Sequence, residues 1–151
     1  MNQSLVIGVD IGGSHITCMA VDLSAREMIP EYVSRKPVDC HGTADSILEV
    51  WVASLNEVIE KLPAGSFGGI GFAMPGPFDY PGGLALFEGV KKYDNLYNVN
   101  IRDEILNRLS LPASMPVRFL NDATCFAIGE AWLGRASAYQ RTMAITLGTG
   151  F

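Results

Sequence analysis

Two adjacent glycines after a short apolar run constrain the fold of this chain more than any other feature. Residues 5–10 form a compact apolar run at strand spacing, and Gly12-Gly13 stops it in a tight turn. Large and small apolar residues alternate over residues 15–21, which predicts a second strand returning beside the first. A third strand is predicted over residues 28–35, at a sheet edge because of Pro30. The sequence therefore predicts a three-strand antiparallel meander with a hairpin at its first corner.

Helices and strands alternate in the rest of the chain. The predicted elements are a helix capped by Thr43 and running to about residue 62, a strand over 68–74, a helix over 101–109 capped by Asn100, a strand over 117–120, a helix over 121–133 with Gly134 as its carboxyl-terminal cap, and a strand over 141–147. Residues 78–100 have no clear period, and long irregular segments tend to be functional. This order predicts an α/β fold, a mixed sheet of about five strands flanked by helices.

Composition and charge exclude several classes of protein. Apolar residues make up 48% of the chain and charged residues 18%, which is typical of a globular domain. The net charge of −5 disfavours nucleic acid as a partner. The apolar run at residues 5–9 is too short for a signal peptide or a membrane span, so we expect a cytoplasmic protein without a membrane partner. Cys18, Cys40 and Cys125 lack metal-ligand spacing and are expected to be free thiols in a reducing compartment.

The glycine turn carries groups that could bind phosphate. Glycines let backbone N–H groups approach phosphate oxygens without a Cβ between them, and the Ser14 hydroxyl could add another donor. Asp10 could hold Mg²⁺ through water. An ordinary hairpin turn is the alternative interpretation of this motif.

A second candidate site lies where an apolar strand meets a helix. Asp122 would lie near a helix amino terminus, whose dipole favours the ionised carboxylate, and could act as a general base. Asn121 could exchange hydrogen bonds with sugar hydroxyls. Helix capping is the alternative role for both residues. The Pro75-Gly76-Pro77 turn offers exposed backbone, although alone it indicates only a strand end.

The last residues repeat the form of the first. Residues 143–147 are an apolar run that enters Gly148-Thr149-Gly150, as residues 5–10 enter the first glycine turn. We therefore expect residues 1–140 to form one domain, and residues 141–151 to be the first strand and glycine turn of a truncated second domain. Neither GxGxxG nor GxxxxGK[ST] follows the first strand, so neither a Rossmann nor a P-loop site is predicted.

Taken together, these segments resemble the ROK family of bacterial sugar kinases and sugar-responsive repressors. The matching segments, in family order and spanning nearly the whole chain, are residues 7–14, residues 71–77, Asn121-Asp122-Ala123 with Ala127 and Gly129-Glu130, and residues 147–150. The resemblance implies a ribonuclease-H-like fold of the actin-like ATPase group. It also implies an ATP-dependent sugar kinase of the hexokinase or glucokinase type, with a sugar, ATP and Mg²⁺ as ligands.

The resemblance also implies a role for each matched residue. Asp10, Gly12, Gly13 and Ser14 correspond to the first phosphate loop, with Mg²⁺ near Asp10, and Gly148, Thr149 and Gly150 correspond to the opening of the second. On the sugar side, Gly76 corresponds to a backbone contact, Asn121 to a sugar ligand and Asp122 to the base that activates the accepting hydroxyl.

Two positions depart from the family pattern, and two rival functions remain. Ser14-His15 stands where members usually have Thr followed by Lys or Asn, and residues 95–98 lack the Trp of many members. A sugar-responsive repressor would carry a helix-turn-helix domain before the first strand, for which a strand beginning at Leu5 leaves no room. An actin-like or chaperone-like ATPase would act by conformational change. We expect residues 1–151 alone to be catalytically inactive and to self-associate, and we expect the protein to be a homodimer.

Overall fold

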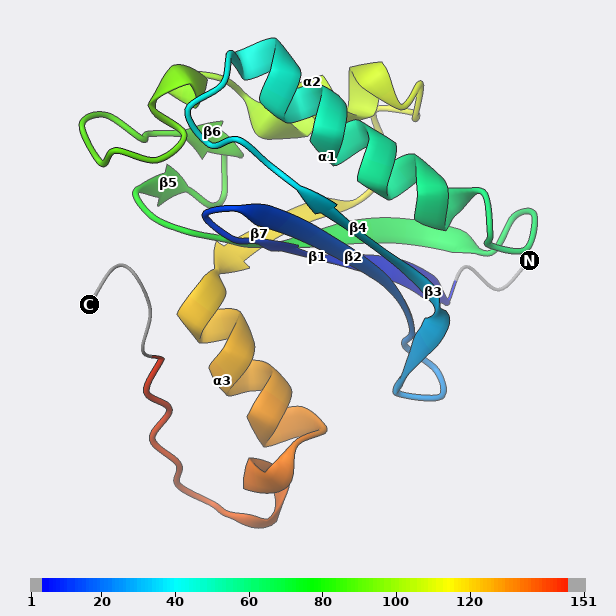
Figure 1. Cartoon of the computed structure of the whole chain (residues 1–151). Coiled ribbons are helices and arrows are strands. Elements are labelled where there is room, and N and C mark those ends of the chain that lie inside the picture. Colours follow the sequence, from blue (N-terminus) through cyan, green and yellow to red (C-terminus); the bar gives the residue numbers. More distant parts are fainter. Residues whose placement is uncertain (1–3, 147–151) are drawn as a thin grey trace.

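The computed structural model describes residues 4–146, which form a mixed sheet with helices on both of its sides (Figure 1). The sheet has five strands in the order β3-β2-β1-β4-β7. Their bounds are Leu5–Ile11 for β1, His15–Asp22 for β2, Glu27–Pro37 for β3, Phe67–Met74 for β4 and Val117–Asn121 for β7. β1, β2 and β3 pair antiparallel, whereas β1, β4 and β7 run parallel. The predicted α/β fold and its meander are confirmed.

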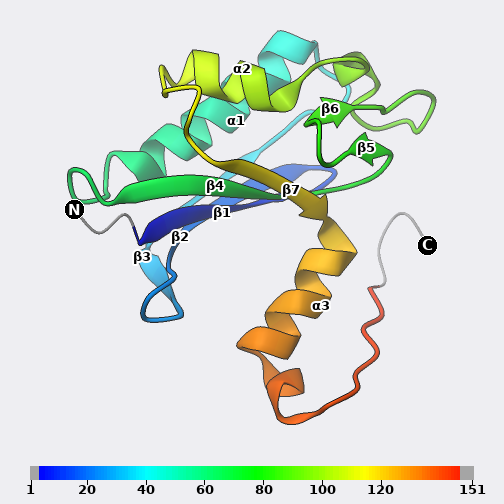
Figure 2. The same ribbon diagram turned by 180° about the vertical axis from the view of Figure 1, so that it is seen from behind.

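Two helices cover one face of the sheet. α1 (Ala44–Ile59) and α2 (Ile101–Arg108) lie on the same side, whereas α3 (Asp122–Trp132) leaves the end of β7 toward the other side (Figures 1 and 2). The predicted caps are confirmed, because Thr43 Oγ1 accepts from the Ser46 amide at 3.2 Å and Asn100 Oδ1 accepts from the Asp103 amide at 3.2 Å. Each bond satisfies an amide that the first helical turn leaves without a partner.

The core lies between the sheet and α1. Alternate residues of β1 point into it, so Ile7, Val9 and Ile11 are buried. α1 contributes a stripe at helical spacing, whose buried members are Ile47, Leu48, Trp51, Leu55 and Val58. Burial of each such large apolar side chain contributes about 1.5–3 kcal/mol, so this stripe fixes α1 on the sheet.

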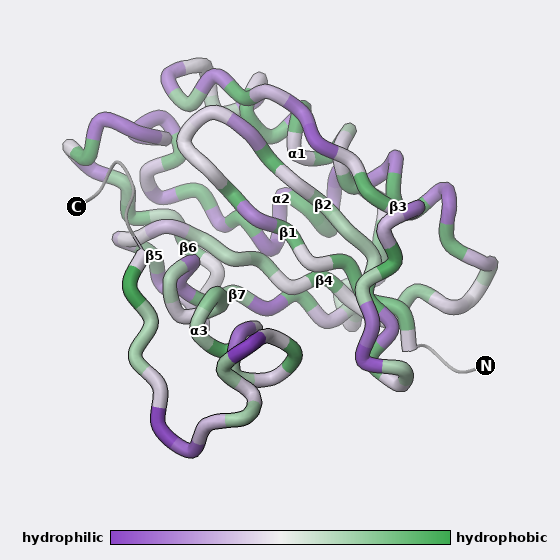
Figure 3. The backbone as a smooth tube through the Cα atoms, turned by 60° about the horizontal axis from the view of Figure 1, so that its bottom comes forward, coloured by the Kyte–Doolittle hydropathy of each residue, from purple (hydrophilic) through white to green (hydrophobic). Residues whose placement is uncertain are grey.

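The opposite face of the sheet is largely open in the described structure. Figure 3 views the molecule from this side, where β1, β2 and β4 are visible and α3 lies near β7. α3 has no buried residue, and Phe126, Ile128 and Trp132 are each at least 43% exposed. No helix within residues 4–146 is long and apolar enough to cross a membrane.

The edge strand β3 contains an irregularity. Met19 pairs with Val33 whereas Ala20 pairs with Ile29, so residues 30–32 have no partner on β2. Pro30 lies within this bulge, where its missing N–H costs no ladder hydrogen bond. The predicted edge position is confirmed.

The segment predicted to be irregular contains short elements. β5 (Phe78–Asp79) and β6 (Leu84–Ala85) form a small hairpin, and η1 (Asp94–Leu96) is a 3₁₀ turn. Asp79 closes the hairpin turn by accepting the Gly82 amide at 3.1 Å, and Gly83 has a φ of 78°. Strands of two residues each are too short to show alternation in a sequence.

Of two predictions near the carboxyl end, one is confirmed and one is wrong. Gly134 follows the end of α3, and its amide donates to the Gly129 and Glu130 carbonyls at 3.2 and 3.1 Å, so it caps the helix as predicted, although its φ of −90° is not left-handed. It precedes a 3₁₀ turn, η2 (Arg135–Ala138). A Cβ on Gly134 would lie 2.4 Å from Glu130 Oε2, so glycine allows a close approach there. Residues 141–146 form no strand, because no neighbouring strand within the described range pairs with them. Leu147 and the rest of the predicted glycine turn lie outside the described residues.

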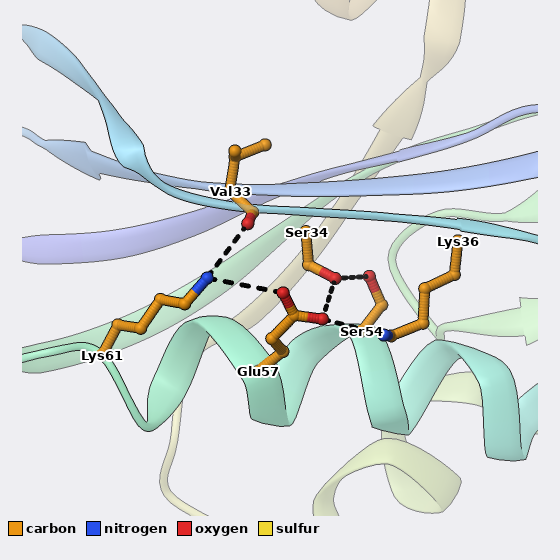
Figure 4. Close-up of polar contacts among 6 residues, drawn as sticks. All are labelled: Val33, Ser34, Lys36, Ser54, Glu57 and Lys61. Carbon is orange, nitrogen blue, oxygen red and sulfur yellow. Dashed lines mark hydrogen bonds and ion pairs between the residues drawn. The ribbon is translucent and has the colours of Figure 1, made fainter.

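A cluster of polar side chains links α1 to the edge strand β3 (Figure 4). Glu57 on α1 accepts hydrogen bonds from Ser34 Oγ at 2.9 Å and from Lys36 Nζ at 2.8 Å. Ser54 Oγ donates to Ser34 Oγ at 3.1 Å, and Lys61 Nζ contacts Glu57 Oε1 at 3.4 Å. The buried hydroxyls of Ser34 and Ser54 are thereby satisfied, as buried polar groups must be.

The cysteines carry no disulfide. Cys18 and Cys40 are buried and Cys125 is half-buried, and all three are free, as predicted. Burial raises the pKa of the Cys18 thiol to about 12, so this thiol stays protonated at neutral pH.

Candidate active site

The candidate residues meet because three parallel strands end at one edge of the sheet. Asp10 of β1 pairs with Ala73 of β4, and Met74 of β4 pairs with Asn121 of β7. Directly after these strands come the glycine hairpin, the turn with Gly76, and Asp122 at the start of α3. In open α/β sheets, ligands bind beyond the carboxyl ends of the strands.

The glycine hairpin joins β1 to β2. The Gly12 amide donates to the His15 carbonyl at 2.9 Å, which closes the turn, and Gly13 and Ser14 are exposed. Within the described chain, the amides of Gly13 and Ser14 donate no hydrogen bond. The Ser14 hydroxyl lies 2.8 Å from His15 Nδ1. The hairpin therefore presents backbone donors to an incoming anion.

At the junction of β7 and α3, the structure shows which of Asn121 and Asp122 caps the helix. Asn121 is the N-cap of α3, and its Oδ1 accepts from the Thr124 amide at 3.2 Å. Asp122 is the first helical residue and is exposed. Its Oδ1 accepts from Asn121 Nδ2 at 3.0 Å and from the Ala123 amide at 2.9 Å. Capping thus falls to Asn121, and the Asp122 carboxylate is held in place facing solvent.

The two carboxylates at this edge, Asp10 and Asp122, interact electrostatically. Burial raises the pKa of Asp10 above its ordinary value, and the negative charge of Asp122 raises it further. Burial also raises the pKa of the Cys125 thiol, with smaller contributions from Asp122 and Asp10. The electrostatics of Asp10 thus depend on Asp122, although the two residues come from β1 and α3.

The ends of β4 and β7, beside Gly76 and Asn121, are connected by a residue that the sequence did not single out. Gly76 is exposed in the turn after β4, and its peptide bond to Pro77 is cis. The Tyr80 hydroxyl donates to the Met74 carbonyl at 3.3 Å and accepts from Asn121 Nδ2 at 3.4 Å. Tyr80 therefore holds the end of β4 beside the end of β7.

Tyr93 is a second residue that sequence reasoning missed. Its hydroxyl donates to the Gly12 carbonyl at 2.5 Å, although its ring is 1% exposed. Burial raises the pKa of Tyr93, with smaller contributions from Cys40 and Asp10, so the phenol stays a donor. The only signal was its place in the long irregular segment, which did not indicate the contact with the hairpin.

The donors at this edge fit a hydrated cation better than a fully protein-bound one. Within residues 4–146, no three His, Cys, Asp or Glu side chains lie together as a metal site. Asp10 offers one carboxylate beside the hairpin that is partly buried and partly open to solvent, which suits Mg²⁺ because that ion keeps several of its waters. The predicted residues Gly148, Thr149 and Gly150 lie outside the described residues.

Comparison with known proteins agrees with the predicted family. Residues 6–151 match the ROK family. The chain is 31% identical over 144 residues to an N-acetyl-D-glucosamine kinase of Haemophilus influenzae, covering 95% of this chain and 43% of that one. It is 29% identical over 151 residues to a glucokinase of Thermotoga maritima, covering 99% of this chain and 44% of that one.

A solved structure shows the same fold. The inorganic polyphosphate/ATP-glucomannokinase of Arthrobacter sp. strain KM superposes with a TM-score of 0.68 and 26% identity, over 87% of this chain and 49% of that one. The chain thus spans less than half the length of these relatives, all of which are named as sugar kinases.

Proposed function

The chain belongs to the ROK family, and we propose that it forms the amino-terminal half of an ATP-dependent sugar kinase. Such an enzyme transfers the γ-phosphoryl group of ATP to a sugar hydroxyl. The observation that carries the proposal is the meeting of a glycine hairpin and a solvent-facing carboxylate at one sheet edge. Asp10 lies near the end of β1 there, and Asp122 begins α3.

Each group at this edge has a distinct proposed role. Gly12, Gly13 and Ser14 bind phosphate oxygens through the hairpin, and Asn121 and the Gly76 backbone bind sugar hydroxyls. Asp122 accepts the proton of the attacking hydroxyl. Its Oδ1 already accepts two hydrogen bonds, and this leaves the other oxygen for the sugar. Phosphoryl transfer depends mainly on positioning and charge stabilisation, which these groups supply.

ATP is proposed as the donor and Mg²⁺ as its companion ion. When bound, Mg²⁺ would neutralise part of the charge of the phosphates. Asp10 would hold it through water beside the hairpin. A cation there would also offset the repulsion between Asp10 and Asp122 that raises the pKa of Asp10.

The wider organisation is proposed on the same basis. Residues 1–140 form the sugar- and phosphate-binding domain, and residues 141–151 begin a second domain with Gly148, Thr149 and Gly150 in its phosphate loop. Three free cysteines favour the cytoplasm, where thiols stay reduced. A homodimer is proposed from the exposed apolar side chains of α3.

Release of ADP from the full-length protein tests the proposal. We expect ADP release to require a sugar, with glucose, N-acetylglucosamine and N-acetylmannosamine compared at equal concentration. A chaperone-like ATPase would release ADP without any sugar. A sugar-responsive repressor would bind sugar, shift DNA fragments in a gel and release no ADP. Either result would contradict the kinase assignment.

A further inference from the structure

Lys92 comes from a distant part of the chain, and its side chain lies over the glycine hairpin. A Cβ built on Gly13 would be 3.3 Å from Lys92 Nζ, 3.3 Å from Cε and 3.6 Å from Cδ. The end of the lysine side chain therefore lies over Gly13, and a larger residue at position 13 would push it aside. Lys92 belongs to the segment that precedes η1, 79 positions after Gly13 in the sequence.

The backbone that carries Lys92 is fixed by its neighbour. The Tyr93 amide donates to the Cys40 carbonyl at 2.9 Å, and the Tyr93 hydroxyl donates to the Gly12 carbonyl at 2.5 Å. The Tyr93 ring contacts Trp51 edge-on, with centroids 5.6 Å apart, and Phe87 at 6.0 Å. These contacts fix the backbone from which the Lys92 side chain reaches the hairpin.

The negative charges around the hairpin indicate what the Lys92 ammonium could do there. Asp10 and Asp122 are both acidic and lie at this edge, so an approaching polyphosphate is repelled by them. The amides of the exposed residues Gly13 and Ser14 can donate hydrogen bonds to an anion, yet they carry only partial charges. A full positive charge beside Gly13 offsets the repulsion and adds a charge-assisted contact.

We propose that Lys92 is a phosphate-binding residue, which places its ammonium on the polyphosphate chain of the nucleotide where that chain meets the Gly12–Ser14 hairpin. This proposal rests on the proposed function for the identity of the ligand as ATP. It assigns to the segment before η1 a part in nucleotide binding. The geometry that carries it is the contact of Lys92 with Gly13 and the anchoring of Tyr93 on Gly12.

Neighbouring lysines provide a matched test in the full-length protein. Lys91 is exposed and adjacent, so Lys91→Gln removes the same charge as Lys92→Gln without the contact to Gly13. Binding of tripolyphosphate, ATP and AMP to each variant is measured by calorimetry, and thermal unfolding checks that both variants stay folded. We expect Lys92→Gln to weaken tripolyphosphate and ATP binding about tenfold and to leave AMP unchanged, as the loss of one charge-assisted contact predicts.

The outcomes separate this proposal from the kinase assignment. Equal losses in the two variants, an equal loss for AMP, or no tripolyphosphate binding by the unsubstituted protein would overturn the role of Lys92. Absence of sugar-dependent ADP release, together with tripolyphosphate binding that depends on Lys92, would overturn the kinase and leave the phosphate contact standing.

Discussion

The Tyr93 hydroxyl donates a hydrogen bond of 2.5 Å to the Gly12 carbonyl, which joins residues 81 positions apart. Through this bond the segment before η1 is attached to the glycine hairpin. The Gly12 carbonyl is thereby occupied, whereas the amides of the exposed residues Gly13 and Ser14 donate no hydrogen bond within the described chain. This bond thus links the segment before η1 to the phosphate side of the proposed site.

Tyr93→Phe removes this hydrogen bond and keeps the ring. We expect the free energy of unfolding to fall by about 1 kcal/mol, because the Gly12 carbonyl loses its donor. In the full-length enzyme the KM for ATP is expected to rise while the KM for sugar changes little. Urea unfolding and steady-state kinetics measure the two effects. Tyr32→Phe, a half-exposed tyrosine on β3, is the control and should change neither quantity.

Asp122→Asn tests the proposed base. The amide cannot accept the proton, so kcat is expected to fall by about 10²- to 10⁴-fold while ATP binding and folding persist. Asp103→Asn is a matched control, since Asp103 also lies in the first turn of a helix and is exposed. Equal activities of the two variants would remove Asp122 from the chemistry.

The pKa of Asp10 offers a test that needs no substrate. Burial and the charge of Asp122 raise this pKa above 3.8, so Asp122→Asn should lower it toward that value while burial keeps it raised. Carboxyl carbon NMR titration measures the change. A pKa of Asp10 that does not move would mean that the two carboxylates are not electrostatically coupled in solution. Asp103→Asn should leave it unchanged.

The Glu57 cluster makes stability depend on pH in the acid range. Hydrogen bonds from Lys36 and Ser34 lower the pKa of Glu57 from 4.5 to about 2. The unfolded chain therefore binds this proton first as the pH falls, so the stabilisation is complete above about pH 4.5 and is lost toward pH 2. We expect Glu57→Gln to destabilise the protein at pH 7 and to differ progressively less from the parent as the pH falls through this range.

Chemical unfolding at a series of pH values measures this difference. Glu49→Gln serves as the control, because Glu49 is exposed on the same helix and belongs to no ion pair in the described structure. A stability difference for Glu57→Gln that stayed constant from pH 7 to pH 2 would contradict the assignment of this effect to its carboxylate.

Residues 1–151 alone are expected to phosphorylate no sugar. The chain corresponds to 43–44% of the length of its kinase relatives, so half of the proposed nucleotide cleft would be missing. Exposed apolar side chains on α3 should also favour self-association, which sedimentation measures. Robust phosphorylation by a preparation free of host kinases would show that this half is sufficient.

Local sequence patterns predicted the strands and helices well. They could not predict contacts between residues that are distant in the sequence. Strand alternation placed β1 and β2 within a residue or two, and Asn100 and Asn121 marked the starts of α2 and α3. The roles of Tyr80 and Tyr93 depend on which loops the sheet brings together. The strand predicted over 141–147 failed because apolar residues alone do not supply a neighbouring strand.

The bulge at Pro30 has a consequence for how the protein behaves in a crowded solution. β3 is an outer strand, and a long regular outer strand offers a row of unpaired backbone groups on which another polypeptide can add. Three residues out of register and a proline interrupt that row, so an incoming strand finds no continuous partner. The opposite outer strand, β7, offers only five residues. Both borders of the sheet are thus poor templates for amyloid-like growth.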